Sequence, residues 1–401
     1  MEQPVDEAAL ADVSYRGTEG DMFDQIMDMA NPQPRYLKMI EDGGIVCPIE
    51  GFAFASSRSA VDQVLKNPAA FTSRGVVQLG NVRPMIPLSV DPPEHVKYRK
   101  ILDPLFAPKK MDAIEGDIAA RVNHFIDAFA DRGSCHFTDE LAVPFPSAVF
   151  LGLMGLPWDE LDTFLRLKEG ILRPGGGTPD PEERTRIQDE TAQEIYAYFN
   201  AILDERQKHP QGDILTGFLD AEVDGERLSR EEILDICFLF LIAGLDTVTD
   251  SLTCFFAYLA EHPEHRRQIV EDEAIIPRAV EELLRWESPV PGTPRVATAD
   301  TEVAGCPIAA GTLVLASIGA ANVDPAEFDH PFEVRFDRAE NRHLGFGGGV
   351  HRCLGSHLAR RELRVTLREW HRRIPDYELK PGIELEYPAG LRTVENLELV
   401  W

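Results

Sequence analysis

The stretch "FGGGVHRCLG", residues 346–355, places three consecutive glycines shortly before a single cysteine, Cys353. Glycine lets a backbone approach another group closely, so the pattern indicates a binding loop. A phosphate-binding loop of the Walker type also carries Gly-Lys-Ser/Thr, which is absent here. A zinc site needs several close ligands, and only His351 is near. The remaining interpretation is a thiolate beside something flat and bulky, favoured by the dipole of the helix that follows and by Arg352.

The cysteine loop resembles the haem-binding loop of the cytochrome P-450 monooxygenases, Phe-x-x-Gly-x-x-x-Cys-x-Gly. The matching residues are Phe346, Gly349, Cys353 and Gly355. The resemblance extends over essentially the whole chain and is closest to the soluble bacterial camphor hydroxylase type. It implies a mainly α fold, a triangular helical prism formed by residues 1–401 as one domain, with haem b as the cofactor and Cys353 as the iron ligand. The implied reaction inserts one atom of O₂ into a C–H bond and consumes two electrons and two protons.

A second motif, "AGLDT" at residues 243–247, lies within the longest helical pattern. An acid next to an alcohol is unusual inside a helix because both are poor helix formers. Taken alone, Thr247 fits a threonine whose hydroxyl donates a hydrogen bond to a backbone carbonyl one turn earlier in its own helix. The segment resembles the oxygen-binding helix of the same family. The resemblance implies that Gly244 leaves room for O₂, that Thr247 hydrogen-bonds it during reduction, and that Asp246 passes protons inward. It also implies that Arg173 pairs with Asp246.

Two further sets of charged residues match the family. Glu282 and Arg285 stand one helical turn apart and, taken alone, form an ordinary surface pair of little stabilising value. The resemblance instead makes them a buried structural pair, with Arg338 as a third member. Haem propionates are anionic and need cationic or polar partners. The residues that match the family's propionate partners are His95, Arg99, Arg295 and His351.

The composition excludes several classes of protein. The 401 residues carry a formal net charge of −28, whereas nucleic acids and anionic membranes bind basic surfaces. No apolar run reaches the roughly 20 residues that span a bilayer, and the acidic N-terminus lacks a signal-peptide pattern. The six cysteines form no C-x-x-C pair, so we expect reduced thiols. We therefore expect a cytoplasmic monomer that binds neither nucleic acid nor a membrane.

Helical patterns dominate the chain, and strand-like runs are short. Apolar residues recur at helical spacing in residues 115–131, 186–207, 230–262, 276–287 and 356–373. The short strand-like runs predict a small β-rich lobe. Its expected segments are about residues 35–60, 295–320 and 376–401.

The substrate pocket is expected to be largely apolar, as suits hydroxylation of a C–H bond. Arg83 stands where the camphor enzyme has the tyrosine that grips camphor's carbonyl, which argues against camphor itself. Small terpenoids are the preferred substrate class through the resemblance, and steroid, fatty-acid and aromatic substrates stay open. The expected pocket residues are Arg83, Met85, Leu88, Leu239, Ile242, Val290, Pro291, Leu391 and Arg392.

Basic residues gather in the segments expected behind the cysteine, although the protein as a whole is acidic. Such a patch can steer an acidic electron carrier, but solvated helix faces also collect Lys and Arg. The expected electron donor is a [2Fe–2S] ferredoxin served by a separate NAD(P)H-dependent reductase. The residues of this basic face are Lys97, Lys109, Lys110, Arg352, Arg360, Arg361 and Arg364.

Two other functions use a similar cysteine loop. A haem-thiolate peroxygenase typically lacks the adjacent acid and alcohol, so Asp246 and Thr247 argue against it. A haem sensor needs neither a proton relay nor a docking face for an electron carrier. The sequence therefore predicts a haem-thiolate monooxygenase.

Overall fold

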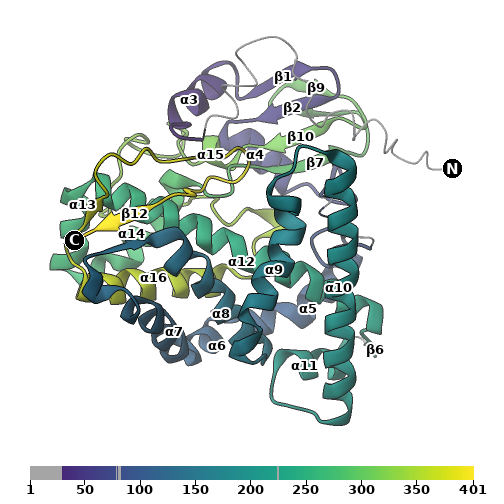
Figure 1. Cartoon of the computed structure of the whole chain (residues 1–401). Coiled ribbons are helices and arrows are strands. Elements are labelled where there is room, and N and C mark those ends of the chain that lie inside the picture. Colours follow the sequence, from purple (N-terminus) through teal and green to yellow (C-terminus); the bar gives the residue numbers. More distant parts are fainter. Residues whose placement is uncertain (1–28, 78, 80–82, 224) are drawn as a thin grey trace.

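A computed structural model describes residues 29–77, 79, 83–223 and 225–401 (Figure 1). Helices make up most of this part, as predicted, and in Figure 1 a small sheet lies above them. Within these residues, no helix is both long and apolar enough to cross a bilayer. The helices are α3 (Gln33–Glu41), α4 (Arg58–Leu65), α5 (Glu94–Leu102), α6 (Pro108–Ala113), α7 (Glu115–Asp127), α8 (Pro144–Met154), α9 (Leu161–Leu172), α10 (Pro181–Lys208), α11 (Ile214–Asp220), α12 (Arg230–Glu261), α13 (Pro263–Glu271), α14 (Ile276–Glu287), α15 (Ile318–Ala321) and α16 (Ser356–Arg373).

Side chains that bind free backbone N–H groups explain where the long helices begin. The hydroxyl of Ser229 accepts from the N–H of Glu232, whose carboxylate accepts from the N–H of Ser229, and this capping box starts α12. The carboxylate of Asp180 accepts from the N–H of Glu182, so α10 begins earlier than its apolar pattern predicts. The helices predicted at residues 276–287 and 356–373 coincide with α14 and α16.

The β-rich lobe is smaller than predicted. Its five-stranded sheet has the order β1-β2-β10-β7-β3, with β10 parallel to β2 and antiparallel to β7. Short hairpins β5-β6 and β8-β9 lie outside this sheet. The strands are β1 (Ile45–Ile49), β2 (Phe52–Ala55), β3 (Phe71–Thr72), β4 (Ser134–His136), β5 (Glu222–Val223), β6 (Glu226–Arg227), β7 (Thr293–Ala297), β8 (Thr301–Val303), β9 (Cys306–Ile308), β10 (Leu313–Ala316), β11 (Glu378–Leu379) and β12 (Glu398–Val400).

The prediction that residues 376–401 join this lobe is wrong. β11 and β12 pair with β4 in a separate three-stranded sheet. Figure 1 shows β12 beside the helices, away from the five-stranded sheet. The reason is burial, because Leu399 of β12 packs in the helical core with Trp370 of α16. The sequence pattern of a strand does not reveal which other strand it pairs with.

The helix α12 is apolar on all sides, which is typical of a helix enclosed by others. From Ile233 to Ile242 its residues pack in one apolar cluster with residues of α8, α9, α10 and α11. From Val248 to Tyr258 they pack in a second cluster with residues of α7, α14 and α16. Ala243, Gly244 and Thr247 lie between these halves and belong to neither cluster. The middle of the helix is therefore free to border a cavity.

The pair of Glu282 and Arg285 is buried in α14. Arg285 Nε and Nη2 donate to the two carboxylate oxygens of Glu282 at 2.9 and 2.8 Å. Arg338 Nε donates to the same carboxylate at 2.9 and 3.0 Å, which agrees with the sequence hypothesis, and Asn341 Nδ2 donates at 2.9 Å. A buried carboxylate is stable only with such partners. Glu282 thus holds the segment that leads into the cysteine loop.

Candidate active site

A cavity of about 330 Å³ lies between the middle of α12 and the segment that carries Cys353. Cys353 and Phe346 line one part of its wall, and Ala243, Gly244 and Thr247 line another. The remaining wall is mostly aliphatic and aromatic. It includes Leu88, Phe106, Phe150, Leu153, Leu239, Phe240, Val248, Leu284, Val290 and Ile318.

The cysteine loop adopts a conformation that two glycines permit. Gly347 and Gly349 have φ angles of +66° and +64°, in the left-handed region that other residues rarely adopt. A Cβ atom on Gly349 would lie 2.0 Å from the carbonyl oxygen of Leu65, at the end of α4, so only glycine fits. The N–H of Cys353 donates to the carbonyl of Phe346 at 2.9 Å and closes the loop. The close approach at Gly349 is therefore to α4.

The surroundings of Cys353 act on its thiol in opposite directions. Burial raises its pKa, while the backbone of Gly355 and the guanidinium groups of Arg99, Arg360 and Arg352 lower it. Burial is the larger effect. A thiolate at this position therefore needs further positive charge, of the kind that a metal ion coordinated by the sulfur would supply.

Four basic side chains line the same cavity, namely His95, Arg99, Arg295 and His351. The rings of His95 and His351 lie 4.4 Å apart, and each has a buried Nε2 with no hydrogen-bond partner among the described residues. Burial lowers the pKa of Arg295 to about 10. Burial, together with Arg295 and His95, lowers the pKa of His351 to about 3. Buried cations and unpartnered imidazoles of this kind fit a ligand with anionic groups.

On α12, Thr247 lines the cavity, whereas Asp246 does not. The carboxylate of Asp246 instead accepts a hydrogen bond from Lys168 Nζ of α9 at 2.8 Å, and Lys168 is almost fully buried. The predicted contact of Asp246 with Arg173 is wrong. Arg173 follows the last residue of α9, where its half-exposed side chain pairs with Glu395 at 3.0 Å.

Three polar residues near the cavity have no signal in the sequence motifs. One is Lys168, which stands in an amphipathic helical pattern as a surface lysine would. Ser251 lines the cavity one turn after Thr247 and donates to the carbonyl of Thr247 at 2.7 Å. Glu362 also lines it, burial raises its pKa well above the usual range, and its Oε2 has no partner within the described part of the chain. Only the folded arrangement singles out these residues.

Known proteins match this chain over most of its length. The cytochrome P-450 family model matches residues 178–370. The probable cytochrome P-450 127A1 of Sinorhizobium fredii is 36% identical over 344 residues, which cover 84% of this chain and 81% of that protein. The chain belongs to the cytochrome P-450 family.

Two further relatives of this P-450 add detail. The steroid C26-monooxygenase of Mycobacterium tuberculosis is 34% identical, over 82% of this chain and 88% of that protein. The solved structure of CYP109E1 from Bacillus megaterium in complex with testosterone superimposes with a TM-score of 0.84 and 28% identity, and covers 92% of this chain and 99% of that one. The P-450 is accordingly a monooxygenase with thiolate-ligated haem b as its cofactor.

The residues around the cavity fit haem b. The apolar wall suits the flat porphyrin, and the thiol of Cys353 lines the same space. The cluster of His95, Arg99, Arg295 and His351 offers cationic and polar partners for two propionates. A bound carboxylate would also partner the two buried imidazole nitrogens.

The predicted substrate contacts divide into two groups. Leu88, Leu239 and Val290 line the cavity of the P-450. Met85 and Ile242 pack inside an apolar cluster instead, because their registers turn them into the core. The predicted residues that lie outside the cavity lining are Arg83, Met85, Ile242, Pro291, Leu391 and Arg392.

Ion pairs hold both arginines of that second group. Arg83 Nε lies 2.9 Å from Asp235 Oδ1, and its guanidinium stacks over the ring of Tyr196. Arg392 is buried with its Nη2 2.8 Å from Glu287 Oε2. Both arginines lie outside the cavity lining, and each guanidinium lies against an acid of a neighbouring helix.

Several residues of the predicted basic face also make internal ion pairs. Arg360 and Arg364 both contact Glu281, at 2.7 and 3.3 Å. Arg361 contacts Asp112 and Glu115, and Lys97 contacts Glu232 at 2.9 Å. The exposed members of the face are Lys109, Lys110 and Arg352. The free positive charge of the face is thus smaller than its composition predicts.

Replacing Gly349 by Ala is expected to impair haem binding, because the added Cβ overlaps the Leu65 carbonyl and displaces the loop that carries Cys353. Gly176→Ala is the matched control, because Gly176 lies outside the cavity lining. Its φ angle is nearly the same as that of Gly349, but a Cβ there meets no protein atom within 4 Å. The control therefore shows the effect of backbone strain by itself, which costs about 1 kcal/mol. The haem-to-protein ratio of the purified variants measures the effect. Equal haem content in both variants would contradict the packing role of Gly349.

Proposed function

We propose that this P-450 hydroxylates an apolar substrate with O₂, with Cys353 as the iron ligand. The observation that carries the proposal is that Cys353 and Thr247 line one cavity, most of whose remaining wall is apolar. Bound haem supplies the activation of O₂, to which the thiolate contributes electron density. The protein's own residues orient the substrate, exclude water and deliver protons.

In this proposal, Thr247 delivers protons inside the cavity. Its hydroxyl lies 3.4 Å from the carbonyl of Ala243, a long hydrogen bond that leaves it available to a closer partner. Beside it, a Cβ on Gly244 would come within 3.2 Å of the Phe150 ring. A glycine at this position therefore keeps α12 close to α8 and the cavity open beside Thr247.

Asp246 is the carboxylate that takes part in the proposed proton delivery. Its side chain is largely buried on the side of α12 that faces α9, where it contacts Lys168. Asp246 directly precedes Thr247, which lines the cavity. A carboxylate held there by a buried ammonium can accept protons from solvent and pass them inward when it turns. We assign control of this movement to Lys168.

The proposed substrate class is a bulky apolar molecule of the steroid type, ahead of the small terpenoids that the camphor-type resemblance favours. The apolar wall supports this class, as do the printed names of the M. tuberculosis and B. megaterium relatives. A free fatty acid is less suited, because the carboxylates of Asp235 and Glu287 already pair with Arg83 and Arg392.

The proposed electron donor is a ferredoxin that docks where Arg352 is exposed behind Cys353. The backbone carbonyl of Arg352 accepts from Arg99 Nη1 at 2.8 Å, so this surface connects directly with a side chain that lines the cavity. The exposed Lys109 and Lys110 add positive charge to the same basic face. An acidic carrier would be steered to such a surface.

Thr247→Ala is expected to keep the red-shifted Soret band of the reduced, carbon monoxide-bound protein and to uncouple NADH use from product. The loss of one positioned proton donor predicts at least a roughly tenfold fall in product per NADH. The measurement uses ferredoxin, reductase and NADH, and product should vanish when the ferredoxin is omitted. Thr253→Ala, on the same helix but outside the cavity lining, controls for helix stability. Unchanged coupling in Thr247→Ala would refute its role, and peroxide-driven turnover at the full rate would favour a peroxygenase.

Lys168→Met is expected to slow product formation about tenfold, because Asp246 loses the contact that holds its carboxylate in place. Arg173→Met is the matched control, since Arg173 pairs with Glu395, and its rate should stay within about twofold of the parent. Single-turnover rates in H₂O and D₂O measure the proton-dependent step. A slower Arg173→Met variant beside an unchanged Lys168→Met variant would reverse the assignment.

Testosterone is expected to shift the Soret band from the low-spin to the high-spin position at lower concentration than borneol or palmitic acid. The reason is that a rigid apolar ring system packs against the apolar wall of the cavity, whereas a fatty acid would also have to bury its carboxylate. Spectral titration of the haem-loaded protein with the three compounds measures the difference. Tighter binding of borneol would restore the terpenoid class, and tighter binding of palmitic acid would show that a cation is available to a carboxylate.

A further inference from the structure

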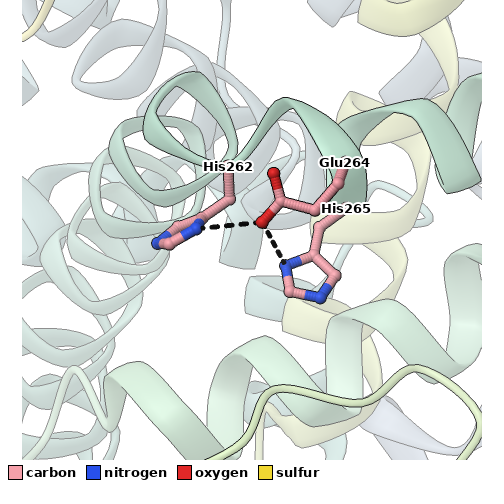
Figure 2. A group of neighbouring side chains, drawn as sticks. All are labelled: His262, Glu264 and His265. Carbon is pink, nitrogen blue, oxygen red and sulfur yellow. Dashed lines mark hydrogen bonds and ion pairs between the residues drawn. The ribbon is translucent and has the colours of Figure 1, made fainter.

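The junction between α12 and α13 brings two imidazoles and a carboxylate together (Figure 2). α12 ends because Pro263 follows His262, and the residue before a proline avoids the helical conformation. His262 has φ −122° and ψ 71°, and Pro263 then begins α13. The N–H of His265 returns to the carbonyl of His262 at 3.0 Å. This tight turn directs the side chains of His262, Glu264 and His265 toward one another.

Three possible ligand atoms converge at this turn. Nδ1 of His262 lies 3.2 Å from Oε1 of Glu264, and Nδ1 of His265 lies 3.9 Å from the same oxygen. All three ligand atoms lie within 4.8 Å of one another. A tetrahedral ion with bonds of about 2.0–2.2 Å needs ligand atoms roughly 3.3–3.6 Å apart. A contraction of about 1 Å therefore brings the set to that geometry.

Aromatic side chains hold both imidazoles in place. The ring of Tyr258 lies 4.1 Å from that of His262 and 5.7 Å from that of His265, and Phe336 lies 5.3 Å from the ring of His265. The His265 ring also bonds to the backbone of Val334, while its Nδ1 lies 2.9 Å from the Tyr258 hydroxyl. A proton on Nε2 and a lone pair on Nδ1 satisfy both contacts, so the Tyr258 hydroxyl occupies the lone pair that a metal ion would use and must turn away when the ion binds. The contact of the ring N–H with the Val334 backbone is the kind of outer partner that orients an imidazole bound to a metal ion.

We propose that His262, Glu264 and His265 form a binding site for a divalent transition-metal ion of the Zn²⁺ type. Two imidazoles and a carboxylate are ligands that Zn²⁺ accepts, and water completes the coordination. The carbonyl end of α12 adds a favourable negative potential. None of the three residues lines the haem cavity, so the site is separate from the monooxygenase chemistry. A bound ion would pin the end of α12 to α13.

Calorimetric titration of the haem-loaded protein with Zn²⁺ tests the proposal. We expect one ion per chain, and a loss of affinity of about tenfold or more in Glu264→Gln. Glu271→Gln, at the other end of α13, is the matched control and should bind as the parent does. Tyr258→Phe should not weaken binding, because it removes a hydroxyl that competes with the ion for Nδ1 of His265. Circular dichroism and the Soret band show whether each variant is folded. If one of them is not, His262→Gln is measured in its place, because it also removes a proposed ligand.

Anomalous scattering at the zinc edge then locates the ion. A peak within about 2.2 Å of both Nδ1 atoms supports the site. The proposal is overturned if Zn²⁺ does not bind, if Glu264→Gln binds as tightly as the parent, or if the peak lies elsewhere, for example at the exposed thiol of Cys47. Glu264 then serves only as an acid in the first turn of α13, where it complements the helix dipole.

Discussion

The enclosure of α12 by other helices is the constraint on which the architecture depends. A helix that is apolar on every side must be covered on every side, and here one apolar cluster covers its first half and another its second half. Where the clusters part, Ala243, Gly244 and Thr247 are too small to fill the space. The cavity thus results from small and polar residues in the middle of a helix whose other side chains are mostly large and apolar. The same helix ends at His262, where the proposed metal site lies.

The cysteine loop reaches this cavity through two kinds of contact. Glu282 collects hydrogen bonds from Arg285, Arg338 and Asn341, and so fixes the segment before the loop. Gly349 then allows the loop to lie directly on the carbonyl of Leu65. Buried charge and close backbone packing therefore position Cys353, whereas the basic cluster on the cavity wall suits an anionic partner.

Charge composition explains why several basic residues do not serve the roles predicted for them. The chain has 68 Asp and Glu residues against 40 Lys and Arg residues, so most cations find an acid nearby. Arg83, Arg392 and Arg360 all pair with acids of other segments. Lys168 pairs with Asp246 for the same reason, and Asp246 directly precedes Thr247, which lines the cavity. In so acidic a protein, an arginine in a loop is a weak indication of a substrate contact.

The sequence by itself determined the mainly helical class, the main helices and the position of the cysteine loop. These follow from local patterns, because apolar periodicity, caps and a ten-residue motif are read within single segments. It also indicated the buried Glu282, Arg285 and Arg338 set. Only the tertiary structure decided that β11 and β12 leave the lobe for β4, that Lys168 and not Arg173 holds Asp246, and that Arg83 and Arg392 lie outside the cavity lining. Each of these depends on which distant segment supplies the partner strand or the opposite charge, and no local pattern contains that information.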